Sequence, residues 1–310
     1  CIKPLNVYTP YLQLGNTPDT KVTDSQIDGG PANADASYAG EMTLTDAVKW
    51  SKNTVAWNIY QQITPKTGSS FLIKMGIHKI WVDKDYNAGA LGGFTYGVTT
   101  EEMAGGYAAL ANDGVYRKAT CIRLIVNASN KTVVNETNRD SKVYDKSASR
   151  MMTQMLREVV LSGTGTSANV ENAVVAGKTG TTNAIKDVWF CGYSKYYTTT
   201  VWAGYDYPKE MSGVNSRVNA IFKDFMTAVH TNLPVTDFST VTQQTTQPET
   251  TAAVQEETES LPQETTAIVP ETTGIEQVTP QQVPSTTAQV PTTTPYQRWT
   301  TAPAQPKTTA

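Results

Sequence analysis

The residues best suited to chemistry form the run Gly-Lys-Thr-Gly-Thr-Thr-Asn at positions 177–183. The apolar and β-branched residues around it predict a strand. Side chains alternate along a strand, so Lys178 and Gly180 are expected on one face and Thr179 on the other. At a sheet edge, such a strand can pair with an extended peptide while the ammonium and the hydroxyls hold a carboxylate. A K-T-G tripeptide also occurs by chance, so an ordinary exposed strand is an equal alternative.

A second group of suitable residues is Ser51-Lys52-Asn53, an S-x-N sequence on or beside a predicted helix. It places a hydroxyl and a carboxamide in one turn, where the first can relay a proton and the second can hold a substrate amide. The pattern has poor specificity. Residues 167–169, Ser-Ala-Asn, also match it, and a polar surface turn is the ordinary alternative.

Lys3 is the third candidate, because a lysine three residues after a serine at a helix start can take the serine proton when its amine is neutral. No serine in the chain has a lysine three residues later. Counting back from Lys3 places the required serine immediately ahead of Cys1. The chain starts without an initiator methionine, so we expect a fragment that lacks this nucleophile. Taken alone, Lys3 would be a solvated N-terminal charge, and only the other two sequences argue against this.

The elements that must position these residues alternate between helical and extended patterns, which predicts an α/β (α+β) fold with an antiparallel sheet. The first helix begins at Thr43-x-x-Asp46, a variant of the capping box, and runs to about residue 63. A second begins at Thr99-x-x-Glu102 and ends near residue 112. A third extends from about residue 147 to the turn at 163–165, with an apolar side formed by Met151, Met155, Leu156 and Val159.

Three strands and one more helix follow. Residues 173–181, 188–193 and 199–205 are predicted strands, the last two joined as a hairpin. We expect the aromatic residues of the middle strand and Cys191 to pack in the core rather than form a stacking platform. The final helix should lie across the sheet through an apolar stripe formed by Val218, Ile221, Phe222, Phe225 and Val229.

Composition narrows the remaining function classes. A net charge of −3 gives no reason to expect nucleic acid as a partner. Three scattered cysteines lack metal or disulfide spacing, and two isolated histidines, His78 and His230, disfavour a Ser-His-Asp triad or a metal site. We therefore expect no cofactor. Residues 233–310 are rich in Thr, Pro, Gln and Glu, which predicts a disordered tail with wall contact as one option.

Taken together, the three short sequences resemble the S-x-x-K, S-x-N and K-T-G signature of penicillin-binding proteins and serine β-lactamases. The resemblance is to the transpeptidase domain of the class A, bifunctional penicillin-binding proteins, over residues 1–232. It implies a β-lactamase/transpeptidase-like fold that lacks the two strands preceding the nucleophile, leaving about three. The segments that carry it are residues 2–5, 7–8, 90–99, 176–183 and 186–193.

The resemblance also implies a role for each candidate residue. Lys3 would be the general base for the serine, and Ser51 would shuttle a proton. Asn53 would hold the acyl-donor peptide, and Lys178 would support the proton network electrostatically. Thr179, Gly180 and Thr181 would bind the substrate, with the two threonines on its terminal carboxylate and the Thr181 N–H as an oxyanion donor. The partners implied are D-Ala-D-Ala stem peptides and β-lactams. The parent protein would be anchored in the bacterial plasma membrane, act on its outer face, and carry a glycosyltransferase domain.

Two other functions share parts of this pattern. A serine β-lactamase needs a base for deacylation, and the E-x-x-L-N sequence that supplies it in the common type is missing from the chain. A β-lactam sensor module would need an attached signalling domain, for which a Thr/Pro-rich tail is poorly suited. We therefore expect a transpeptidase, with these two as the alternatives.

Overall fold

The computed structural model describes residues 1–122, 124–135 and 140–240, all within one unit of the chain, Cys1–Thr246. Most of the predicted tail, residues 241–310, lies outside the described residues. The α-helices are α1 (Thr9–Gln13), α2 (Leu44–Lys49), α3 (Asn53–Ile63), α4 (Pro65–Lys74), α5 (Thr100–Ala111), α6 (Lys146–Ser162) and α7 (Asn215–Val229). Among the described helices, none has the length and apolarity that a membrane span requires.

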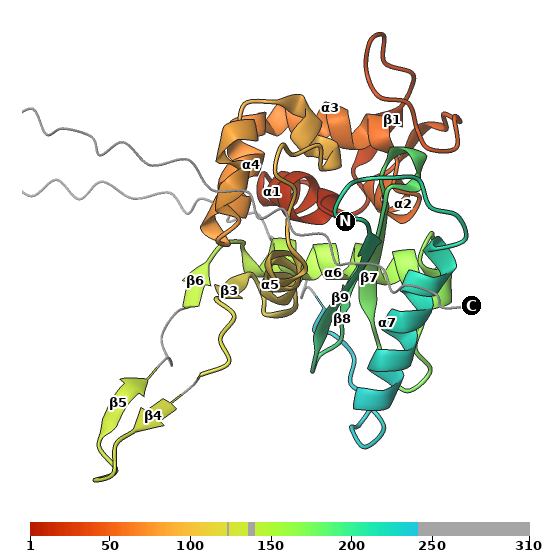
Figure 1. Ribbon diagram of the computed structural model, residues 1–310. Helices are drawn as coiled ribbons and strands as arrows, with labels where there is room; N and C mark the ends of the chain where they lie inside the picture. The colour runs from red at the N-terminus through yellow and green to blue at the C-terminus, as the bar shows by residue number, and fades with distance from the viewer. Residues whose placement is uncertain (123, 136–139, 241–310) are drawn as a thin grey trace, which may run out of the picture. The chain divides into compact units, whose positions relative to one another are not determined.

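The main sheet has three antiparallel strands in the order β7 (Ala176–Thr181), β8 (Asp187–Tyr193) and β9 (Thr198–Gly204). Figure 1 shows this sheet beside α7. Lys178 lies opposite Cys191, and Thr179 lies opposite Phe190. The predicted hairpin, its third strand and the three-strand count are thus confirmed. Because β7 pairs only with β8 in this sheet, the strand that carries Lys178 is an edge strand.

The two faces of β8 pack against different helices, as strand alternation requires. Val188 and Phe190 join the cluster that contains Phe222 of α7. Cys191 and Tyr193 join the larger core, which includes residues of α5 and α6. The prediction that the strand residues are core is confirmed for Phe190, Cys191 and Tyr193, whereas Trp189 is only partly buried. Lys178 shares the second face, since it is paired with Cys191.

Short elements complete the fold. Three two-stranded antiparallel sheets pair β1 (Lys21–Asp24) with β2 (Gly40–Thr43), β3 (Val115–Arg117) with β6 (Asp140–Lys142), and β4 (Leu124–Val126) with β5 (Thr132–Asn135). The short helices are the π-helix η1 (Pro4–Tyr8) and the 3-10 helices η2 (His78–Asp83), η3 (Asn87–Leu91), η4 (Thr166–Ala168) and η5 (Asn183–Ile185).

The prediction of one continuous helix from residue 43 to about 63 is wrong, because the structure has two helices there. Thr43 caps α2 through its hydroxyl, which accepts from the Asp46 N–H. The helix then ends at Lys49, and Ser51 has a φ of 57°, in the left-handed region. α3 starts at Asn53. A left-handed backbone conformation interrupts the α-helix, so Ser51 and Lys52 lie in the break and Asn53 is the first residue of α3.

The apolar stripe predicted for the last helix is also partly wrong. The buried line on α7 is Val218, Phe222 and Met226. Ile221 and Phe225 are exposed by 55% and 49%. A helix resting on one sheet buries a narrow stripe, and these two residues lie beside it.

The residues that follow α7 still contact the domain beyond residue 232, where the sequence predicts the tail to begin. Asp237 accepts 2.7 Å from Arg157 of α6. The Phe238 ring lies 5.5 Å from that of Tyr193, edge to face. Arg150 donates to the Thr240 carbonyl at 3.0 Å. Residues 233–240 are therefore held against the domain by an ion pair, an aromatic contact and hydrogen bonds.

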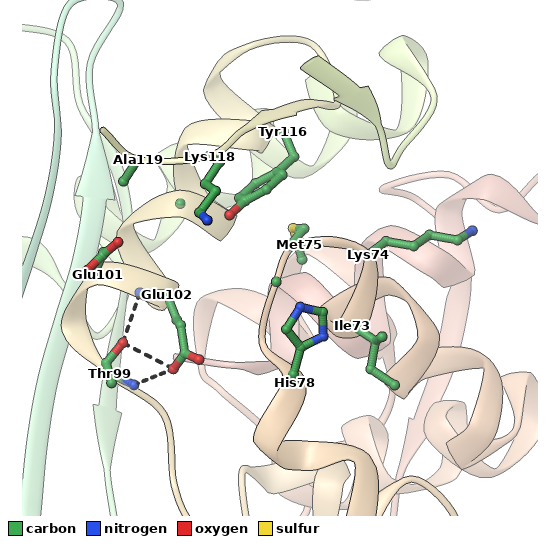
Figure 2. A pocket seen from close by; sticks show the side chains of 12 residues that line it. Ile73, Lys74, Met75, His78, Thr99, Glu101, Glu102, Tyr116, Lys118 and Ala119 are labelled. Carbon is green, nitrogen blue, oxygen red and sulfur yellow. Dashed lines mark hydrogen bonds between the residues drawn. The ribbon is translucent and has the colours of Figure 1, made fainter. Parts of the chain in front are cut away.

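The start of α5 has the predicted capping box. The Thr99 hydroxyl accepts from the Glu102 N–H, and the Glu102 carboxylate accepts from the Thr99 N–H at 2.7 Å (Figure 2). Thr99→Ala should lower the free energy of unfolding by about 1 kcal/mol, because one N–H of the first turn loses its acceptor. Denaturant titration measures this change. Thr99→Ser should be nearly neutral, and equal losses in both variants would contradict the role of the cap.

Candidate active site

The start of η1 is fixed in the interior by two tyrosine side chains. Tyr107 of α5 donates to the Cys1 carbonyl at 2.7 Å, and Tyr144 donates to the Leu5 carbonyl at 2.5 Å. All five residues of η1 are buried. Lys3, at the N-cap of this helix, is buried with it. The structure therefore excludes a solvated terminal charge at this position.

The Lys3 amine meets three acceptors, all from residues 51–53. Its Nζ lies 2.6 Å from Asn53 Oδ1, 2.8 Å from the Ser51 carbonyl and 3.4 Å from the Lys52 carbonyl. The two shorter contacts can each take one N–H of the amine and so fix its orientation. Burial, and then the charge of Lys178, hold the pKa of Lys3 well below its ordinary value.

The structure brings Lys3, Ser51 and Asn53 together, as the sequence predicts. Ser51 contacts Lys3 through its main-chain carbonyl rather than its hydroxyl. Asn53 uses both ends of its amide, accepting from Lys3 and donating to the Ala32 carbonyl at 2.9 Å. The turn at residues 51–53 can therefore orient the amine of Lys3.

The β7 strand lies directly against Cys1, which precedes η1. The Cys1 thiol donates to the Lys178 carbonyl at 3.0 Å. A Cβ on Gly180 would lie 2.6 Å from the Cys1 nitrogen, so only glycine permits this approach. Lys178 is almost fully buried, and burial lowers its pKa to about 7. Its ammonium donates to the Thr179 carbonyl at 3.0 Å.

Thr179 and Thr181 of β7 differ in their surroundings. Thr179 is paired through its hydroxyl with the Thr164 hydroxyl at 2.7 Å, in the turn after α6. Thr181 is exposed at the end of β7, opposite Val188. The Thr164 N–H donates to the Lys49 carbonyl of α2 at 3.3 Å, which links this turn to the helix before Ser51. Thr164 was missed in the sequence, where the turn reads only as a helix stop.

Other features of the described residues take no part in this arrangement. A cavity of about 430 Å³ lies between the end of α4, the start of α5 and β3, with His78 and Tyr116 in its wall (Figure 2). None of the predicted site residues lines it. The three cysteines are unpaired, and Cys191 is buried as predicted. In the described part of the chain, no three His, Cys, Asp or Glu side chains gather where a metal ion could bind.

Comparison with known proteins shows the family of the chain. Residues 4–227 match the family described as "Penicillin binding protein transpeptidase domain". The chain belongs to this family. It is 34% identical over 238 residues to penicillin-binding protein 1F of Bacillus subtilis (strain 168), covering 73% of this chain and 33% of that protein. It is 37% identical over 215 residues to penicillin-binding protein 1A of Aquifex aeolicus (strain VF5), covering 67% and 28%.

Solved structures of penicillin-binding proteins share the fold. The PonA1 protein of Mycobacterium tuberculosis in complex with penicillin V matches with a TM-score of 0.65 and 21% identity, over 77% of this chain and 70% of that chain. Penicillin-binding protein 1A of Haemophilus influenzae matches with a TM-score of 0.62 and 22% identity, over 77% and 42%. The family and fold expected from the sequence, including the class A resemblance, are confirmed. The chain spans about one third of the curated relatives' length.

Proposed function

We propose that the natural protein containing this chain, called the whole protein below, is a serine-type peptidoglycan D,D-transpeptidase. The observation that carries the proposal is the buried Lys3 amine, oriented by Asn53 Oδ1 and the Ser51 carbonyl beside the edge strand β7. Membership of the transpeptidase family supports the reaction class. Stem peptides ending in D-Ala-D-Ala are the proposed substrates, and β-lactams are the proposed inhibitors.

The proposed nucleophile is a serine that precedes Cys1 in the whole protein, three residues before Lys3. Lys3 takes the hydroxyl proton while the serine oxygen attacks the carbonyl between the two D-alanines. The C–N bond then breaks, and the terminal D-alanine leaves with a proton. An amine of a neighbouring stem peptide attacks the acyl-serine, forms the cross-link and returns the serine hydroxyl. Amide bonds made and broken balance, so no cofactor is required.

The remaining residues receive roles consistent with their positions. Ser51 and Asn53 stand beside Lys3, where they can relay the proton and hold the donor peptide. β7 offers its edge to an extended peptide, and Gly180 allows close approach. Thr179 and Thr181, with the charge of Lys178, are proposed to hold the terminal carboxylate.

The setting of the reaction is proposed from the relatives. Their greater length leaves room for the membrane anchor and glycosyltransferase domain that class A membership implies. The transpeptidase domain would then work on the outer face of the plasma membrane. Contact between the cell wall and the Thr/Pro-rich residues after 232 is a further part of this proposal.

One experiment can distinguish a transpeptidase from a β-lactamase and from a β-lactam sensor. The whole protein is incubated with uncross-linked glycan strands that bear pentapeptides, and the digested products are analysed by mass spectrometry. A transpeptidase yields cross-linked muropeptides and free D-alanine, and stoichiometric penicillin stops both. Rapid catalytic hydrolysis of the penicillin would favour a β-lactamase. Stable acylation without cross-links would favour a sensor, and either result would overturn the proposal.

The missing S-x-x-K pair leads to a prediction for the 310-residue chain alone. It should form no covalent adduct with a fluorescent penicillin, whereas a protein extended upstream by its native residues should be labelled in a one-to-one ratio. Intact-mass spectrometry checks both, and near-UV circular dichroism confirms that the compared chains are folded. Labelling of the unextended chain would contradict the position assigned to the serine.

A further inference from the structure

A buried cluster lies behind the turn at residues 51–53, around Asp24 at the end of β1. The Asp24 carboxylate accepts from Thr54 Oγ1 at 2.5 Å, from Asn33 Nδ2 at 2.6 Å and from the Ala39 N–H at 2.9 Å. It also lies 3.3 Å from Lys52 Nζ. Burial opposes the charge, but these hydrogen bonds and Lys52 keep the pKa of Asp24 below its ordinary value.

Lys52, the middle residue of the S-x-N sequence, contacts the Asp24 cluster with its side chain and Lys3 with its main chain. Its ammonium contacts Asp24, Asp35 at 3.2 Å and the Ser37 hydroxyl at 3.1 Å. The side chain is only 7% exposed. Its main-chain carbonyl faces the Lys3 amine. Lys52 therefore ties the turn that touches Lys3 to the loop of residues 25–39.

The same loop supplies the cap of α3. Lys52 is the N-cap residue, and its side chain caps no N–H. Asn33 Oδ1 takes that place, accepting from the Asn53 N–H at 2.7 Å and from the Thr54 N–H at 3.3 Å. Exposed N–H groups at a helix start require such acceptors. The orientation of Asn53 thus depends on a residue twenty positions earlier in the chain.

We propose that Asp24, Asn33 and Lys52 are positioning residues for acyl transfer. They hold the turn at residues 51–53 in its left-handed conformation, so that the Ser51 carbonyl and Asn53 Oδ1 direct the Lys3 amine. The inference rests on the proposed function. Ser51 has a conformation that residues with a Cβ disfavour, so the turn needs an external restraint to persist. None of the three side chains is required to touch the substrate.

A positioning role can be separated from a purely stabilising one. Replacing both members of a buried ion pair by neutral groups often leaves stability nearly unchanged, whereas removing one member leaves a buried charge. The test variant is therefore the double substitution Asp24→Asn/Lys52→Met in the whole protein. The matched control is Arg150→Met, which breaks the ion pair with Asp113 at 2.9 Å outside this cluster.

Two readouts are compared among the parent, the double variant and the control. Saturation kinetics with a penicillin separate the initial binding constant from the maximal acylation rate, and hydrogen exchange reports the Asn53 and Thr54 amides. In the double variant we expect a maximal rate lower by about ten- to hundredfold, since misplacement by about 1 Å has effects of this size. Binding should change by less than about twofold. Exchange at both amides should be at least about tenfold faster. The control should keep parental values.

Parental acylation and exchange in a folded double variant would overturn the inference. Asn33→Ala, which removes the cap and the hydrogen bond to Asp24 but leaves the ion pair, gives a second test with the same expected changes. Equal effects in Arg150→Met would reduce the cluster to a contribution to stability and also overturn the inference. If the parent is not acylated, the proposed function fails, while exchange at Asn53 and Thr54 still decides whether the cluster holds the turn.

Discussion

Lys3→Met in the whole protein is expected to slow acylation by a penicillin by about 10²–10⁴-fold, the range for removal of a general base. Methionine fills a similar volume, so the buried helix start should keep its packing. Ser51 and Asn53 would lose their shared contact with the amine. The measurement is the second-order rate of adduct formation, followed by fluorescence after rapid mixing.

The matched control for this variant is Lys142→Met, which removes an exposed lysine paired with Asp145. Its acylation rate should equal that of the parent. A Lys3→Met protein that is folded and acylated within about threefold of the parental rate would exclude Lys3 as the base. Since the pKa of Lys3 is lowered, acylation in the parent should rise with pH as the amine loses its proton.

Lys178→Met is expected to slow acylation by about 10²–10³-fold, the scale for removal of one electrostatic contact to the transition state. The pKa of Lys178 is about 7, lowered by burial. If its charge supports the reaction, acylation in the parent falls above about pH 7. This decline should disappear in Lys178→Met. A parental rate in the variant would make β7 an ordinary edge strand.

The same lysine makes stability depend on pH in a defined direction. Between about pH 7 and its ordinary value of 10.5, Lys178 is neutral in the folded protein and protonated in the unfolded one. Unfolding then takes up a proton, so the free energy of unfolding rises with pH across this window. Below it, the buried charge costs stability. Lys178→Met should show a shallower rise and no loss of stability at pH 7, checked by denaturant titration across pH. A lower stability than the parent at pH 7 would contradict this account.

Local sequence patterns were sufficient to predict β7 and the start of α5. The period-two alternation placed Lys178 and Gly180 on one face, and the structure pairs them with Cys191 and Trp189. The capping box at Thr99 gave the start of α5. These features depend on neighbours within a few residues, which a sequence pattern displays directly.

The features that sequence patterns missed depend on distant contacts. Val48 and Val55 fit one helical period, so the break at Ser51 has no local signal. Asp24 and Asn33 reach residues 52–54 only because β1 and the following loop return to α3. Phe238 stands in a Thr- and Pro-rich sequence, and only its contact with Tyr193 shows that it packs.

The most direct test of the central claim is the position of the acylated residue. The whole protein is saturated with a penicillin and digested, and the modified peptide is sequenced by tandem mass spectrometry. We predict one adduct, on a serine three residues before Lys3, in the peptide that continues into Cys1-Ile2-Lys3. An adduct on Ser51, or on any residue that does not precede Lys3 by three, would contradict the assignment of Lys3 as the base.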